Sequence, residues 1–117
     1  MAESLREKQS RFAGYVARLI DWVNANGYEI TLGEVQRDQR VADLNAASGA
    51  GISTSLHLIS LAVDVHLFKD GTYLTDTEAY RPLGEWWKTL APDCRWGGDF
   101  RNRPDGNHLS VEHEGRA

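Results

Sequence analysis

The chain has 117 residues, of which 13 are basic and 17 are acidic, and its formal net charge is −4. This length predicts a single domain over residues 1–117, built around one hydrophobic core. The acidic balance argues against a nucleic-acid partner, because phosphate binding normally needs a clustered basic surplus. Cys94 is the only cysteine, which excludes an intramolecular disulfide and a cysteine-rich zinc knuckle.

The N-terminal segment carries charges throughout and lacks the continuous apolar run of a signal peptide. No apolar run elsewhere in the chain reaches membrane-spanning length. We therefore expect a soluble protein that is made in the cytoplasm and does not insert into a membrane. If it acts outside that compartment, another component must release it. The predicted helices leave no spare hydrophobic stripe, so a monomer is expected.

The first half of the chain predicts a helix, a strand and a second helix. Apolar residues recur at three- and four-residue steps up to Asn26-Gly27, which is typical of an amphipathic helix and its stop. Alternation over residues 28–32 predicts a short strand. A second helix is expected next, with Val41 and Leu44 on its inner face, and the small residues at 47–55 predict a loop.

The second half predicts a hairpin, a third helix and a last strand. Leu61–Phe68 is expected to be a buried strand that turns at an Asp-Gly pair and runs antiparallel with the next segment. Thr75 and Glu78 have the spacing of a capping box, which predicts a third helix that ends before Pro92. A loop and a short strand from His108 follow. The fold class is therefore α+β, a small domain with helices on one side of an antiparallel sheet.

Polar side chains with metal-binding chemistry lie in and around the predicted buried strand. Alternate residues of a strand share a face, so Asp64 and His66 project away from the aliphatic set. His57 lies seven positions before Asp64, where the chain enters the strand and can fold back to the same site. A second cluster places Asp105 three residues before His108.

Two histidine nitrogens and one carboxylate oxygen form a three-ligand zinc site that keeps a fourth position open for water, as catalytic sites do. Zinc lowers the pKa of that water, and a nearby unligated carboxylate can take its proton. Asp105 is placed for that role. Taken singly, each residue also fits an ordinary structural role, as a loop histidine, a strand-edge charge or a turn, and both interpretations stay open at this point.

Two short segments resemble the motifs of a known family. SLHLISLAVD, at residues 55–64, resembles the Ser-x-His-x-x-Gly-x-Ala-x-Asp motif of the zinc D-Ala-D-Ala carboxypeptidase and L-alanyl-D-glutamate endopeptidase family, which includes many bacteriophage endolysins. DGNH, at residues 105–108, resembles its second motif, an acidic residue three positions before the last zinc-binding histidine. The similarity extends from about Thr31 to Glu112. One departure is Ser60, which stands where the motif has glycine.

The resemblance implies a DD-peptidase/hedgehog-like fold and one Zn²⁺ ion per chain. Carried over position by position, it implies that His57, Asp64 and His108 bind the zinc. It also implies that Asp105 is the catalytic general base. An aspartate in this role matches the phage endopeptidase-like branch of the family rather than a D-Ala-D-Ala dipeptidase.

The resemblance further implies a basic side chain that stabilises the developing oxyanion. Arg37 stands where that arginine is expected, and Arg40, one helical turn on, is the alternative. Three other residues are candidates for positions around the metal ligands. Ser55 is expected to hydrogen-bond near the site, His66 to be a partner of a ligand, and Asp99 to orient a ligand.

The predicted function is a zinc peptidase that cuts the stem peptide of peptidoglycan, between L-alanine and D-glutamate, as a phage or prophage endolysin that lyses the host. A holin-type partner is implied, because the chain lacks a signal peptide, and the enzyme acts on the cell wall after release. One alternative is D,D-carboxypeptidase cleavage at the end of the stem. Another is a non-catalytic zinc-binding or virion structural domain.

Overall fold

The computed structural model of the chain describes residues 2–33 and 56–117 and begins with a long helix. Helix α1 (Leu5–Ala25) is opened by a capping box. The Ser4 hydroxyl accepts a hydrogen bond from the Glu7 N–H, and the Glu7 carboxylate accepts one from the Ser4 N–H. The helix ends at Asn26, and the next residue, Gly27, has a φ of 82° that suits glycine. The predicted helix and its stop are confirmed.

An antiparallel sheet forms the second layer. Its strands are β1 (Glu29–Leu32), β2 (Ala62–Lys69), β3 (Thr72–Tyr73), β4 (Cys94–Trp96) and β5 (His108–Val111). The order is β1-β2-β5-β4, and β3 also pairs with β2. Asp70 and Gly71 connect β2 to β3 with positive φ values of 52° and 78°, which confirms the predicted hairpin turn.

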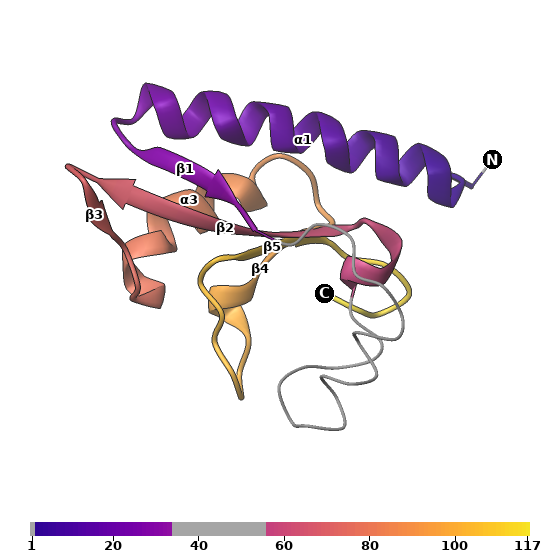
Figure 1. The fold of residues 1–117 in the computed structure, drawn as a ribbon. Helices are drawn as coiled ribbons and strands as arrows, with labels where there is room; N and C mark the ends of the chain where they lie inside the picture. The colour runs from indigo at the N-terminus through magenta and orange to yellow at the C-terminus, as the bar shows by residue number, and fades with distance from the viewer. Residues whose placement is uncertain (1, 34–55) are drawn as a thin grey trace.

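The two α-helices of the described residues pack on the same face of the sheet. Helix α1 lies lengthwise over the strands (Figure 1), and helix α3 (Arg81–Lys88) packs beside it. The buried ring of Trp87 makes edge contacts with Phe12 and Tyr15 of α1, and its Nε1 donates a hydrogen bond of 3.0 Å to the Ser110 carbonyl of β5. The predicted α+β class, with helices on one side of an antiparallel sheet, is confirmed.

The start of the third helix differs from the prediction. Residues Thr77–Tyr80 form a 3-10 turn, η2, whose N-cap Asp76 makes no side-chain cap hydrogen bond. The Glu78 carboxylate instead accepts hydrogen bonds of 2.7 and 2.8 Å from Arg81. The α-helix begins only at Arg81, with Pro82 in its first turn, where proline's missing N–H costs nothing. The capping box predicted from Thr75 was therefore wrong.

Strand β4 was expected to be part of a loop. It is only three residues long, which is too short for an alternating apolar pattern to be recognised. Its pairing partner is β5, which comes later in the chain and places Leu109 opposite Trp96. The predicted second helix, with Val41 and Leu44, and the loop at 47–55 lie outside the described residues. Within the described part, neither helix has the length and apolar character needed to cross a bilayer.

Candidate metal centre

The register of two central strands places two polar side chains together. In the antiparallel pair of β2 and β5, Asp64 lies directly opposite His108. Directly opposed residues project to the same face, so the carboxylate and the imidazole meet. The neighbouring Val63 and Val65 project to the other face, where they are fully buried beneath the helices. The predicted alternation along β2 is thus observed, and it directs the polar set away from the core.

A tight turn before β2 brings a second histidine to the same place. His57 lies in a 3-10 turn, η1 (Leu56–Ile59), and Ser60, with a φ of 55°, reverses the chain into the strand. A hydrogen bond of 3.1 Å from the Leu61 N–H to the Leu56 carbonyl closes this turn. The His57 side chain is buried and its ring meets that of His108 edge to face, with centroids 5.3 Å apart.

The three side chains converge on one oxygen atom. His57 Nε2 and His108 Nδ1 each lie 3.4 Å from Oδ1 of Asp64. One potential ligand atom from each residue lies within 4.8 Å of the others. Oδ1 of Asp64 is buried and accepts no hydrogen bond, which is costly for a carboxylate unless a cation binds it. Two imidazoles and one carboxylate are ligands that zinc prefers, so the donor set fits such an ion.

The electrostatics keep Asp64 ready to bind a cation. Burial raises the pKa of its carboxyl, but the adjacent His108 and His57 outweigh that effect and hold the pKa well below its ordinary value. The side chain is therefore a carboxylate at neutral pH, which is the form that coordinates a metal.

A loop held by two glycines carries Asp105 to the edge of this cluster. The Asp105 N–H donates a hydrogen bond of 2.9 Å to the Gly97 carbonyl, and the Asp105 carbonyl accepts one of 3.1 Å from the His108 N–H. A Cβ at Gly97 would overlap the Asp105 carbonyl oxygen, and one at Gly106 would lie 2.7 Å from Cα of Thr77. Both glycines are thus needed for the close approach of backbone that fixes the loop.

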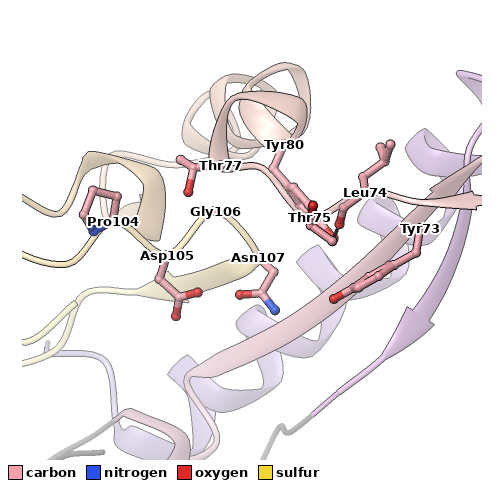
Figure 2. Close-up of a pocket in the computed structure, with 9 residues that line it drawn as sticks. All are labelled: Tyr73, Leu74, Thr75, Thr77, Tyr80, Pro104, Asp105, Gly106 and Asn107. Atoms are coloured by element: carbon pink, nitrogen blue, oxygen red, sulfur yellow. Dashed lines mark hydrogen bonds between the residues drawn. The ribbon is translucent and has the colours of Figure 1, made fainter.

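The pKa of Asp105 is shifted by the groups around it. Desolvation and the negative charge of Asp64 raise the pKa of the Asp105 carboxyl, while the charges of His108, His57 and Arg103 oppose this. The backbone of Asp105 is hydrogen-bonded to that of His108, although Asp105 is outside the set of converging ligand atoms. Asp105 is exposed and is one of the residues that line an open pocket (Figure 2).

The other predicted site residues are distributed differently. His66 shares the face of Asp64, but its Nδ1 lies 3.1 Å from the Tyr73 hydroxyl, and it is not among the converging ligands. Asp99 accepts a hydrogen bond of 2.8 Å from Lys88 and is therefore engaged away from the ligands that it was expected to orient. Arg37, Arg40 and Ser55 lie outside the described residues.

The contacts that shape the loop and the pocket were not predicted from the sequence. Trp96 is buried and its Nε1 donates a hydrogen bond of 2.7 Å to the Gly106 carbonyl, which ties β4 to the loop of Asp105. Tyr73 lies in the segment that was expected to pair with the buried strand, and nothing in its spacing marks it as part of a site. The glycines at 97 and 106 were the available signal, because one precedes the second motif and the other lies within it.

Among the described residues, two imidazoles and one carboxylate form a candidate metal site, and three protein ligands beside one open position are typical of catalytic rather than structural zinc sites. A profile of the D-alanyl-D-alanine carboxypeptidase family matches residues 48–111, more than half of the chain. The L-alanyl-D-glutamate peptidase of Listeria phage A118 is 32% identical over an alignment of 102 residues, which covers 84% of this chain and 36% of that protein. The chain belongs to the D-alanyl-D-alanine carboxypeptidase family, as its two motifs predicted.

Solved structures agree on the fold. The L-Ala D-Glu endopeptidase ChiX of Serratia marcescens matches with a TM-score of 0.74 and 18% identity, over 88% of this chain and 79% of ChiX. The vancomycin resistance D,D-pentapeptidase VanY, solved in complex with Zn(II), matches with a TM-score of 0.58 and 21% identity, over 86% of this chain and 70% of VanY. The chain spans only about a third of the length of the phage relative.

Proposed function

We propose that this protein is a zinc-dependent peptidase that hydrolyses the stem peptide of peptidoglycan, most readily between L-alanine and D-glutamate. The observation that carries the proposal is the convergence of His57 Nε2 and His108 Nδ1 on Oδ1 of Asp64, each at 3.4 Å, with Asp105 beside them. One zinc ion per chain is the proposed cofactor. The complex of VanY with Zn(II) supports this choice of metal.

In the proposed mechanism each residue has a separate task. His57, Asp64 and His108 hold the metal, which when bound supplies a Lewis acid that polarises water and the scissile carbonyl. Asp105 takes the proton of the attacking water on its carboxylate and passes it to the leaving amine. Its raised pKa makes it a better base than an ordinary aspartate. Arg37, or Arg40 in its place, is proposed from the sequence alone to stabilise the oxyanion.

Two peptide bonds are candidates, and their products differ. The similarity to the phage L-alanyl-D-glutamate peptidase favours the bond between L-alanine and D-glutamate, whereas the family description names D-alanyl-D-alanine carboxypeptidases. Digests of purified peptidoglycan, analysed by mass spectrometry, separate the two. New D-glutamate amino groups support the endopeptidase, release of free D-alanine supports the carboxypeptidase, and an undigested wall would contradict the proposed function.

The proposed biological setting is that of a phage or prophage endolysin. The chain would be made in the host cytoplasm, released by a holin-type partner and active on the cell wall as a monomeric, single-domain enzyme over residues 1–117. The similarity to a phage peptidase supports this setting. Lysis from without of outer-membrane-stripped Gram-negative cells tests it, because an endolysin lowers their turbidity without a partner once the wall is accessible.

A further inference from the structure

A polar pocket lies against the candidate metal centre and includes Asp105 in its wall. Its cavity of about 180 Å³ lies between the segment from Tyr73 to Tyr80 and the loop of Asp105 (Figure 2). Typical small-molecule pockets measure roughly 300–1,000 Å³, so this one is suited to about one residue of a longer ligand. Such a cavity beside a peptidase centre fits part of an extended peptide.

The walls of the pocket adjoin the two strands that carry Asp64 and His108. Asn107, in the pocket wall, directly precedes His108, and its carbonyl accepts a hydrogen bond of 2.9 Å from the Val65 N–H. On the opposite wall, Tyr73 of β3 lies beside β2, where His66 is two residues from Asp64. A peptide that enters the pocket therefore comes next to the ligands without any change of the fold.

The Tyr73 hydroxyl in the pocket is oriented by a hydrogen bond with His66. The Tyr73 hydroxyl lies 3.1 Å from Nδ1 of His66, and the Tyr73 ring packs on Phe68 with centroids 5.3 Å apart. Figure 2 shows this hydroxyl directed toward Asn107 and Asp105. A phenol can donate one hydrogen bond and accept others, so one bond to His66 leaves capacity for a ligand. Tyr73 is 45% exposed, so this aromatic ring is accessible to a ligand.

The floor of the pocket is rigid. The buried Tyr80 hydroxyl donates a hydrogen bond of 2.8 Å to the Leu74 carbonyl and accepts one of 3.1 Å from the Leu67 N–H. Gly106 allows the loop to approach Thr77 closely. A preformed site of this kind binds a ligand without first paying the entropy of ordering its walls.

The charge of the pocket selects the chemistry of its occupant. Among the described residues, those that line it include no Lys, Arg or His, and Asp105 adds a carboxylate. A carboxylate ligand would be repelled there, whereas an uncharged amide can exchange hydrogen bonds with Tyr73, Thr75 and Asn107. We infer that Tyr73, oriented by His66, binds an uncharged backbone amide of the stem peptide in this pocket and so positions the peptide for hydrolysis. This inference rests on the proposed function.

Tyr73→Phe tests the inference, because it removes one hydroxyl and keeps the ring. Hydrolysis of two synthetic stem peptides is compared, one with the free α-carboxylate of D-glutamate and one with that carboxylate amidated. Loss of one hydrogen bond predicts a KM about three- to tenfold higher for both peptides, with kcat within about twofold and the zinc content unchanged. Thr75→Val predicts a smaller rise. Tyr28→Phe is the matched control, since Tyr28 stacks on Trp22 beneath α1.

Other results would overturn either the inference about Tyr73 or the proposed function. An active wild type whose Tyr73→Phe variant keeps its KM overturns the inference alone. A rise in KM confined to the free carboxylate peptide would show that the pocket binds an anion, which also overturns it. A wild-type protein that binds zinc but cleaves neither peptide overturns the proposed function, and the inference falls with it.

Discussion

Asp64 of β2 lies directly opposite His108 of β5, so the pairing of two strands brings two of the three candidate metal ligands together. The remaining candidate, His57, reaches the same carboxylate from the turn that precedes β2. The centre is therefore a property of the folded sheet, and the unfolded chain has no such site. A metal that binds only the folded state stabilises it by mass action.

Addition of zinc to the metal-free protein is expected to raise its melting temperature. At a zinc concentration 100-fold above Kd the gain is about 2.7 kcal/mol, or roughly 10 °C for a domain of this size. Chelation should reverse the gain and leave a folded protein, because the core packs on the opposite face of β2. Differential scanning fluorimetry measures the shift. Asp64→Asn is the control and should show almost none; an equal shift in that variant would contradict the site.

Asp105→Asn is expected to abolish hydrolysis while the protein keeps its zinc. The amide retains the size of the side chain but cannot accept the proton, so kcat should fall by about 10²–10⁴-fold. Wall digestion and metal analysis are measured on the same sample. Asp99→Asn is the matched control, because Asp99 is an exposed carboxylate paired with Lys88 and should keep its activity. Full activity in Asp105→Asn would remove this residue from the mechanism.

Ser60→Gly is expected to stabilise the protein. Ser60 has a φ of 55°, a left-handed conformation that costs a non-glycine residue roughly 1–2 kcal/mol. Glycine avoids this strain but loses more backbone entropy on folding, so the net gain in the free energy of unfolding should be about 0.5–1 kcal/mol. Urea unfolding checks it. Ser60→Ala keeps the strain and should give no gain; equal stabilisation by alanine would show that the conformation is not the cause.

Asp93→Asn is expected to destabilise the protein at neutral pH but not in acid. Arg11 donates hydrogen bonds of 2.9 and 2.7 Å to Asp93, and they lower the pKa of that carboxyl. Because the pKa of this carboxyl is lower in the folded than in the unfolded protein, its ionised form stabilises the fold at pH values above the unfolded-state pKa near 3.9. This stabilisation is lost as the pH falls through the folded-state pKa.

Both side chains of this pair are about a quarter exposed, so the cost of Asp93→Asn at pH 7 should be about 1 kcal/mol. Urea unfolding near pH 7 and near pH 2 measures it. The variant and the wild type should converge at the lower pH. A difference that is the same at both pH values would show that the ion pair is not its source.

The elements that could be predicted from the sequence are those with local signals. The apolar period of α1, with its stop at Gly27, and the alternation of β2 before Asp70-Gly71 each depend on neighbours in the chain. The same alternation separated Asp64 from the core. Two motifs then indicated His57 and His108 as its partners, although the sequence could not show that all three meet at one oxygen.

The features that could not be predicted depend on long-range contacts. Strand β4 exists because Trp96 pairs opposite Leu109, and the third helix starts late because Pro82 favours a first turn there. Asp99 was a candidate site residue because it is a carboxylate next to two glycines, but in the fold it accepts a hydrogen bond from Lys88. The pocket at Tyr73 forms only when the hairpin and the loop of Asp105 come together in the folded protein. No residue spacing in the sequence predicts that contact.

The measurement that tests the central claim most directly is the zinc content of wild-type protein and of His57→Ala by elemental analysis, made beside the turbidity loss of outer-membrane-stripped Gram-negative cells. We predict one zinc per chain and lysis for the wild type, and the loss of both in a folded His57→Ala variant. A wild type that purifies without zinc, cannot be loaded with it and still lyses cells would contradict the account.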